Sequence, residues 1–186
     1  MSNSSKAAFY RKLYNLINKR KYNSVLDVGC GEMDLIKNIK CHNYLGIDKY
    51  NPKIIINNFK KCTIENFRTK KKFDLICCIQ VMGINSKFNI KKILVNIKKI
   101  ISLVNDNGYI AINFGPIVNV KKINQIIKLF KNNDLEIETH FSYGLFYFKT
   151  NAILFFFINL LLKIFPSIDK VTINKFNFFF LKKSFK

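Results

Sequence analysis

The sequence predicts an α/β protein with a mostly parallel sheet, and three observations support this. Residues 24–28 form an apolar run, SVLDV, that leads directly into Gly29-Cys30-Gly31. A helical pattern follows, and a second apolar run then ends at Gly46-Ile47-Asp48. Farther along, strand-like and helix-like segments alternate. Strands that alternate with helical patterns are typical of βαβ units in a layered sheet.

The first half of the chain supplies the opening elements. Residues 6–20 place apolar side chains at helical spacing with basic residues opposite, which predicts an amphipathic lead-in helix. We then expect a strand at 24–28, a helix at 32–39, a strand at 44–47 and a short third strand at 54–56. Residues 57–72 are basic and poorly periodic, so no element is predicted there.

The second half continues the alternation. Residues 73–79 form a continuous apolar run, which is typical of a buried parallel strand. A helix is predicted at 90–103, where isoleucine and leucine occupy one face and lysine the other. We expect a turn at 105–108, a strand at 109–114, a helix at 120–130, a strand at 135–145 and a final strand at 176–181.

Composition favours one folded domain with an unusual charge balance. The 186 residues are 49% hydrophobic, which excludes a disordered chain and allows a substantial core. There are 32 basic and 11 acidic residues, a formal net charge of +21. Abundant Lys, Asn, Ile and Phe, with few Arg and no Trp, indicate AT-rich coding, which explains part of this charge. The shortage of acids keeps anionic partners (RNA, acidic glycans or lipid headgroups) as an alternative.

Cysteine usage indicates a reduced, cytoplasmic setting. The five cysteines include no C-x-x-C pair and no nearby histidine cluster, so no metal site is predicted. Cys77 and Cys78 lie within an apolar strand pattern, where cysteine acts as a small hydrophobe. No secretory apolar segment is seen at the start of the sequence.

The glycine turn is the most informative motif. Two residues without side chains let the backbone approach a ligand, and a later carboxylate can accept both hydroxyls of a ribose. The sequence V-L-D-V-G-C-G, with an acid before the glycines, resembles the motif of the class I S-adenosylmethionine (SAM)-dependent methyltransferases. The F-D-L-I run at 73–76 and the N-x-G turn before residue 109 match the same family. The resemblance covers residues 24–114 by motif and the rest by order of elements.

This resemblance implies a Rossmann-like fold of seven mostly parallel strands, with helices on both faces. The last strand would run antiparallel and insert beside the fifth. SAM would be the cofactor, with the glycine turn at its methionine end. The carboxylate before the turn would orient the loop or the ammonium, and the later one would hold the ribose. The implied cofactor-binding residues are Asp27, Gly29, Cys30, Gly31, Asp48 and Ile79.

The chain departs from the family at several positions. Met33 replaces the last glycine of G-x-G-x-G, so its side chain must point away from the ligand. Residues 81–84 read V-M-G-I where many relatives have V-L-E-H, and no catalytic residue is identified. His140 and His42 are interpreted as surface or loop histidines. Asp74 is interpreted as a structural acid under the fourth strand, and Cys78 and Gln80 as lying near the cofactor or acceptor.

The adenine contact stays open among Asn57, Asn58 and Cys62, because the local match is loose. No N-P-P-Y box follows Asp74, which argues against methylation of the exocyclic amines of nucleic-acid bases. No Pro-Cys pair occurs there, which weakens a cytosine-C5 mechanism.

The predicted organisation is a single methyltransferase domain over residues 1–186. It comprises a helical start (1–22), the cofactor-binding core (23–145), an apolar insertion (146–174) and the last strand (175–186). The insertion is too short for a comfortable transmembrane helix, which needs roughly twenty apolar residues. It is interpreted as a packed helix, a lid over the substrate, or a peripheral membrane contact.

The expected function is methylation of a hydroxyl or amine on a small-molecule, glycan or lipid-linked acceptor. Two alternatives are an RNA methyltransferase that uses the basic surface and a SAM-binding protein without catalysis.

Overall fold

The structure is a computed structural model in which residues 5–53, 57–82, 89–114, 120–143 and 176–184 are described. Predictions at 54–56 and 146–174 lie outside these residues. The elements are α1 (Ser5–Ile17), β1 (Tyr22–Val28), β2 (Cys41–Asp48), β3 (Phe59–Lys61), β4 (Phe73–Met82), α2 (Ile90–Leu103), β5 (Val104–Phe114), α3 (Val120–Lys131), β6 (Leu135–Tyr143) and β7 (Phe176–Lys183).

The strands form one seven-stranded sheet in the order β3-β2-β1-β4-β5-β7-β6. The pairs β1/β2, β1/β4, β2/β3 and β4/β5 are parallel. β7 lies between β5 and β6 and runs antiparallel to both. This confirms the predicted fold, including the insertion of the last strand beside the fifth. The strand order reverses between β1 and β4, and in such sheets ligands bind outside the carboxyl ends of the strands at that point.

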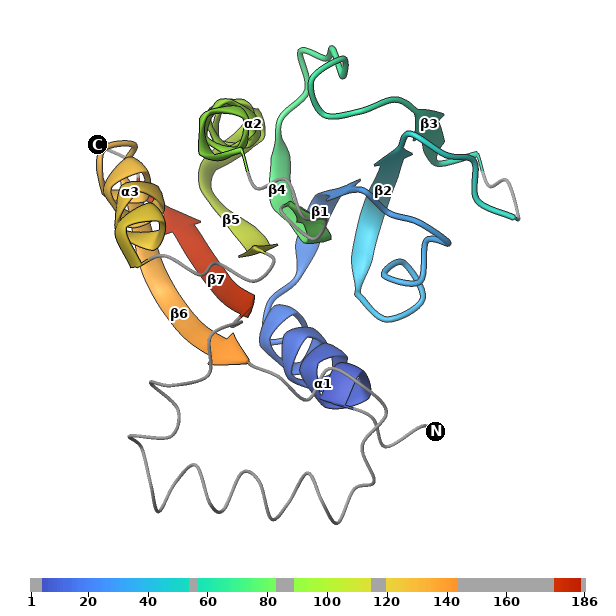
Figure 1. Cartoon of the computed structure of the whole chain (residues 1–186). Coiled ribbons are helices and arrows are strands. Elements are labelled where there is room, and N and C mark those ends of the chain that lie inside the picture. Colours follow the sequence, from blue (N-terminus) through green and yellow to red (C-terminus); the bar gives the residue numbers. More distant parts are fainter. Residues whose placement is uncertain (1–4, 54–56, 83–88, 115–119, 144–175, 185–186) are drawn as a thin grey trace.

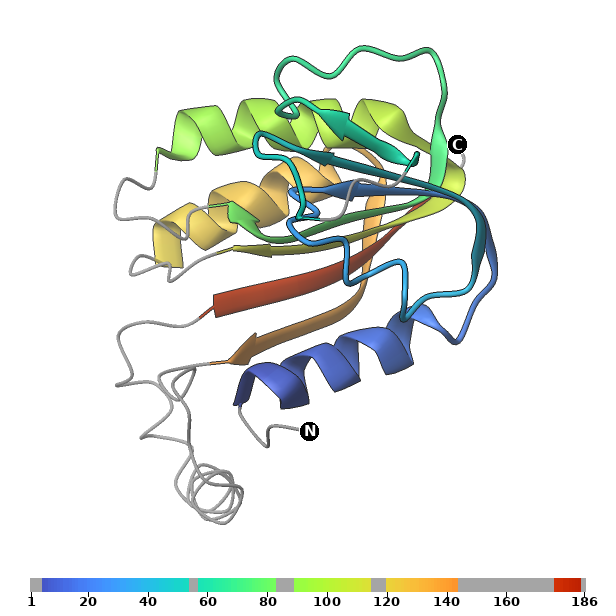
Figure 2. The ribbon, with the colours of Figure 1, turned by 90° about the vertical axis from the view of Figure 1, so that its right-hand side faces the viewer.

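Helices cover both faces of the sheet, as Figures 1 and 2 show: α1 lies on one side, and α2 and α3 lie on the other. Alternation along each strand sends neighbouring side chains to opposite faces. Leu26 of β1 and Ile76 of β4 therefore pack in the core under α2 and α3. Val25 and Leu75, one position earlier in the same strands, pack in the core under α1. Among the described helices, none is long and apolar enough to cross a membrane.

The docking of α1 depends on one apolar stripe. Phe9, Leu13 and Ile17 are spaced four residues apart and are all buried against the sheet. Phe9 also makes an edge contact with Phe178 of β7, with ring centroids 5.8 Å apart. The stripe thus fixes α1 against the sheet. It also sets the position of the partly buried Tyr10 and Tyr14 on the same helix.

Leu13→Ala should lower the free energy of unfolding by about 2–5 kcal/mol, because it leaves a cavity where a fully buried side chain packs. Urea denaturation measures this change. Asn15→Ala is the matched control on the exposed face of α1, and we expect a change below about 0.5 kcal/mol. Equal effects of the two substitutions would contradict the packing described here.

The prediction of a helix at 32–39 is wrong, because the structure has a series of turns there. The backbone N–H of Asn38 bonds to the carbonyl of Leu35, 2.9 Å away, instead of the carbonyl four residues back. The side-chain amide of Asn38 takes that position and donates to the carbonyl of Asp34 at 2.7 Å. Asparagine side chains compete with helical hydrogen bonds in this way.

Several strand boundaries also differ from prediction; β2, for example, begins at Cys41 instead of residue 44, and β4 ends at Met82 instead of residue 79. β3 occurs at Phe59–Lys61, in the segment for which no element was predicted, and pairs with the last three residues of β2. β5 begins at Val104 instead of residue 109. The predicted turn is accommodated as an irregularity in the β4/β5 register, with Asn107 at φ +62°.

Candidate active site

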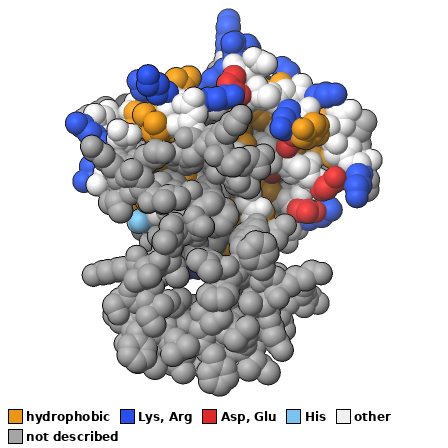
Figure 3. All heavy atoms as spheres, in the orientation of Figure 1, with side chains coloured by type: hydrophobic (Ala, Val, Ile, Leu, Met, Phe, Trp, Pro, Cys, Tyr) orange, Lys and Arg blue, Asp and Glu red, His pale blue; other side chains and the backbone are white. Residues whose placement is uncertain are grey.

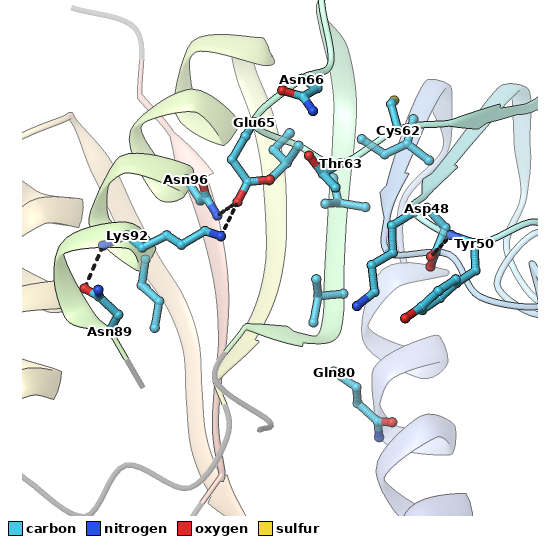
Figure 4. Close-up of a pocket in the computed structure, with 17 residues that line it drawn as sticks. Asp48, Tyr50, Cys62, Thr63, Glu65, Asn66, Gln80, Asn89, Lys92 and Asn96 are labelled. Atoms are coloured by element: carbon cyan, nitrogen blue, oxygen red, sulfur yellow. Dashed lines mark hydrogen bonds and ion pairs between the residues drawn. The ribbon is translucent and has the colours of Figure 1, made fainter. Parts of the chain in front are cut away.

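Two cavities open at the carboxyl edge of the parallel strands. The larger, about 830 Å³, lies between the end of β2, the segment after β3 and the start of α2 (Figure 4). The smaller, about 430 Å³, lies between α1 and the glycine turn. Gly29 and Gln80 line both cavities, so the two meet at the ends of β1 and β4. This is the predicted position of the site.

The glycine turn follows β1 in a left-handed conformation. Gly29 has φ +72° and donates its N–H to the carbonyl of Ile47, 2.7 Å away on β2. Gly31 has φ +53° and donates its N–H to Oδ2 of Asp48 at 3.0 Å. A side chain at Gly29 would clash with Cγ2 of Val81, whereas a Cβ at Gly31 would meet open space. The two glycines are therefore required for different reasons.

Gly29→Ala should cost about 2–4 kcal/mol of stability, since left-handed strain adds to the clash with Val81. Gly31→Ala should cost only about 1–2 kcal/mol, because strain acts alone. Thermal or urea unfolding of both variants measures the difference. Adding Val81→Ala should recover part of the loss at Gly29 and none at Gly31. The same recovery at both positions would contradict this geometry.

Met33 adopts φ +58° at the position where the resemblance expects glycine. Its side chain is 1% exposed and packs beneath the turn, in the core on the α1 side of the sheet. Its Cε would lie 3.2 Å from a Cβ added at Gly46 of β2. The side chain thus points away from the cavities, as expected, and the turn keeps its shape despite the substitution.

Asp27 ends in the smaller cavity and is only 5% exposed. The hydroxyl of Tyr44 on β2 donates a hydrogen bond to its Oδ2. Burial raises the pKa of Asp27 to about 7, and nearby Asp48 adds to the rise, while the Tyr44 bond opposes it. Asp27 is therefore a carboxyl that changes charge near neutral pH, facing a cavity.

Asp48 lies at the tip of β2 and faces the larger cavity. Its Oδ2 accepts the N–H of Gly31 at 3.0 Å, and its Oδ1 accepts the N–H of Tyr50 at 2.9 Å. Each carboxylate oxygen keeps a second lone pair, so the side chain can still accept two hydroxyl groups. The two backbone bonds fix its orientation, which fits the ribose contact that the resemblance implies.

Of the three residues left open for the adenine contact, Cys62 is the one that lines the larger cavity. It donates its N–H to the carbonyl of Asp48 at 2.8 Å. Asn57 and Asn58 are exposed and are not among the residues that line this cavity. Thr63 and Ile64 extend the same wall. The sequence did not indicate these two residues, because the segment before them showed no recognisable element.

A polar cluster missed by sequence reasoning forms the far wall of the larger cavity. Oε1 of Glu65 accepts from Nδ2 of Asn96 at 3.0 Å and lies 3.4 Å from Nζ of Lys92 (Figure 4). Although burial alone would raise it, the pKa of Glu65 falls to about 2, because hydrogen bonds, led by that from Asn96, favour the carboxylate. The cluster joins the segment after β3 to α2.

The end of β4 forms the boundary between the cavities. Ile79 lines the smaller one, and Gln80 has φ +61° and lines both. The backbone N–H of Gln80 donates to Oδ1 of Asn113, a fully buried side chain on β5. A left-handed non-glycine residue held in this way is a common feature of functional sites. Cys78 lies beneath, fully buried and outside both linings.

The other candidates have structural roles. Asp74 accepts the N–H groups of Asn23 and Ser24 at 2.9 and 3.0 Å, which ties β4 to β1 at the opposite edge. His140 stacks on Phe179 and its Nε2 lies 3.1 Å from Oδ1 of Asn177. Neither His140 nor His42 lines either cavity. In the described part of the chain, no group of His, Cys, Asp or Glu could hold a metal ion.

These cavities fit a long, bent nucleoside with a charged tail. The carboxylate of Asp48 suits a ribose at the junction, and the apolar wall at Cys62 and Ile64 suits a flat base. Asp27 suits the ammonium of an amino-acid tail in the smaller cavity, and the backbone N–H groups of the glycine turn lie beside it. The residues present therefore fit SAM, the cofactor that the resemblance implies.

Comparison with known proteins agrees with this geometry. Residues 4–143 match the family model described as "Methyltransferase domain". No curated protein sequence matches the chain significantly.

Solved structures resemble the chain in fold. The N-methyltransferase NodS from Bradyrhizobium japonicum WM9, in complex with S-adenosyl-L-homocysteine (SAH), has a TM-score of 0.64 at 11% identity, covering 97% of this chain and 88% of NodS. A protein from Listeria monocytogenes, provisionally assigned as a SAM-dependent methyltransferase, has a TM-score of 0.66 at 11% identity. The match covers 97% of this chain and 100% of the Listeria protein. The plantazolicin methyltransferase BamL scores 0.60 at 17% identity, with coverage of 98% and 85%. At these identities the likeness concerns the fold alone.

Proposed function

This chain belongs to the methyltransferase-domain family, and from that premise we propose that it transfers a methyl group from SAM to a hydroxyl or amine of a small-molecule, glycan or lipid-linked acceptor. The observation that carries the proposal is the position of Asp48. Its carboxylate is held by two backbone N–H groups and faces the larger cavity, close to the junction of the two.

The residues that would hold the cofactor follow from the two cavities. Asp27 and the backbone of Gly29 and Gly31 would bind its amino-acid end, and Asp48 would accept the ribose hydroxyls. Cys62 and its neighbours would flank the adenine. When bound, SAM supplies an electrophilic methyl group on a positively charged sulfur.

Positioning accounts for much of the expected rate enhancement. Methyl transfer is an in-line displacement, so holding the acceptor in line with the methyl group and excluding water lowers the barrier. Gln80 lines both cavities, and its backbone is fixed by Asn113, so it would face both cofactor and acceptor. A general base is needed only where the acceptor must lose a proton. Among the residues that line the two cavities, none is histidine.

The structural neighbours support acceptors of modest size. NodS is an N-methyltransferase, and the plantazolicin methyltransferase BamL is seen in complex with a triazolic desmethylPZN analogue and SAH. We extend only the general class of acceptor to this chain. From the free cysteines and the excess of basic residues, we propose that the enzyme acts in the cytoplasm or at the periphery of a membrane.

RNA is the second candidate acceptor, and the basic surface favours it. On the face shown in Figure 3, Lys and Arg side chains are spread around the described surface and acidic side chains are few. On this face the described Lys and Arg side chains do not gather into a single track that would follow a phosphate backbone, so we rank RNA below a small acceptor.

Calorimetry with SAM, followed by transfer from methyl-labelled SAM to panels of amines, sugars, lipid-linked glycans and RNA, tests the proposal. We expect SAM binding and salt-insensitive labelling of a small acceptor. Labelling of RNA with a steep salt dependence would favour the second candidate. Absence of SAM binding would refute the cofactor assignment, and binding without labelling of any panel member would point to a protein without catalysis.

A further inference from the structure

The smaller cavity is acidic in a protein that is otherwise strongly basic. Three carboxylates line it, those of Asp27, Glu32 and Asp34, and no Lys, Arg or His is among its lining residues. The whole chain has 32 basic residues and 11 acidic ones. Codon bias toward lysine therefore cannot explain this composition, because it acts in the opposite direction.

The carboxylates differ in how closely they face the cavity. Asp27 is buried at the end of β1, whereas Asp34 lies at the rim, 3.2 Å from the exposed Nζ of Lys37. Glu32 accepts the backbone N–H of Lys53 at 3.0 Å through Oε2. Because burial raises the pKa of Asp27 to about 7, the negative field at neutral pH comes mainly from Glu32 and Asp34, and Asp27 adds to it as the pH rises.

Two tyrosines complete the wall opposite the glycine turn. Tyr10 and Tyr14 lie one turn apart on α1, line the cavity together and have ring centroids 5.7 Å apart. Burial raises the pKa of Tyr14, and the charges of Asp34 and Asp27 raise it further. The stripe of Phe9, Leu13 and Ile17 holds α1 in this position.

Aromatic faces and carboxylates both attract cations. An aromatic ring attracts a cation through its quadrupole, and proteins use such walls for quaternary ammonium groups. Carboxylates act through Coulomb attraction, which strengthens where water is excluded. A sulfonium is a cation of the same kind. SAM carries this charge on sulfur, whereas the sulfur of its product SAH is a neutral thioether.

Resting on the proposed function, we infer that Tyr10, Tyr14 and the two carboxylates nearer the mouth, Glu32 and Asp34, make this cavity selective for the sulfonium form of the cofactor over its thioether product. The walls stabilise a charge that disappears when the methyl group leaves. SAH is then held by one attraction fewer than SAM, which favours its release and limits product inhibition.

Calorimetry with SAM, SAH and sinefungin tests this inference without knowledge of the acceptor. Sinefungin carries a protonated amine where SAM has the sulfonium. In the double variant Tyr10→Leu/Tyr14→Leu we expect the Kd for SAM and sinefungin to rise about 5- to 20-fold, while the Kd for SAH changes less than about threefold. The SAH measurement also shows whether the altered α1 still supports a folded site.

Two further variants sharpen the result. Tyr10→Phe/Tyr14→Phe keeps the aromatic faces and should preserve the ratio of SAH to SAM Kd within about twofold. Glu32→Gln should reduce that ratio by a few-fold at low salt and less at high salt. The exposed Glu136→Gln on β6 is the matched control for the loss of one carboxylate.

The outcomes separate this inference from the proposed function. Equal weakening of SAM and SAH in the leucine variant, or an unchanged ratio, would overturn charge selectivity while the methyltransferase assignment stands. Failure of the unaltered protein to bind either nucleoside would overturn the proposed function, and the inference with it.

Discussion

Asp48→Ala is expected to weaken SAM binding by about 100-fold or more. The substitution removes the charged acceptor of two ribose hydroxyls, and hydrogen bonds to a charged group contribute about 1.5–3 kcal/mol each. It also releases the N–H groups of Gly31 and Tyr50, which Asp48 holds at 3.0 and 2.9 Å. The glycine turn would therefore lose one of its connections to β2 as well as the ligand contact, while the bond from Gly29 to Ile47 remains. Isothermal titration calorimetry with SAM measures the effect.

Two comparisons separate the ligand contact from the turn. Asp48→Asn keeps one oxygen acceptor and should bind SAM with intermediate affinity. Asp106→Asn removes a carboxylate that pairs with Lys183 at 2.8 Å, away from both cavity linings, and should leave binding unchanged. A loss below about threefold in Asp48→Ala would show that the ribose is held elsewhere.

The sequence predicted elements well where one local pattern dominated. The helix at 90–103 occurs at Ile90–Leu103 as predicted, because its apolar face is strongly periodic and Asn89 caps it by accepting from the N–H of Lys92 at 3.2 Å. The segment at 32–39 also has a helical pattern of apolar residues, but the structure shows turns there instead of a helix. Within it, the side-chain amide of Asn38 donates to the carbonyl of Asp34, and Met33 adopts a left-handed backbone conformation. Apolar spacing alone does not register such competition.

The candidate site likewise contains residues that a local motif predicted and residues that only the tertiary fold brings there. The motif around the first strand indicated Asp27, Gly29 and Asp48, because these residues lie close together in sequence. Tyr10 and Tyr14 join them only through the docking of α1, which depends on contacts with β7 at the other end of the chain. Glu65 and Asn96 meet across 31 positions. A single sequence carries no direct signal of such contacts.

Asp27→Asn is expected to stabilise the ligand-free protein at pH 8 while weakening SAM binding. In the folded protein the pKa of Asp27 is raised to about 7, against an ordinary value near 3.8. The folded state therefore binds more protons than the unfolded state between about pH 4 and 7. The free energy of unfolding falls as pH rises through that window, by up to about 1.4 kcal/mol per pH unit from this group.

The test compares the free energy of unfolding of Asp27→Asn with that of the unaltered protein, at pH 4 and at pH 8. The other titrating groups are the same in both proteins, so their contributions cancel when one free energy is subtracted from the other. Asparagine keeps an oxygen for the Tyr44 hydroxyl but carries no charge. We expect the variant to gain about 2–4 kcal/mol over the unaltered protein at pH 8, relative to the difference at pH 4. Urea unfolding at both values measures it, with Glu136→Gln as the matched loss of an exposed carboxylate. SAM affinity should fall about tenfold or more at pH 8, since the ammonium loses its buried partner. A difference in stability that does not vary with pH would mean that Asp27 is already ionised in the empty cavity, and that its burial serves the turn instead of the ligand.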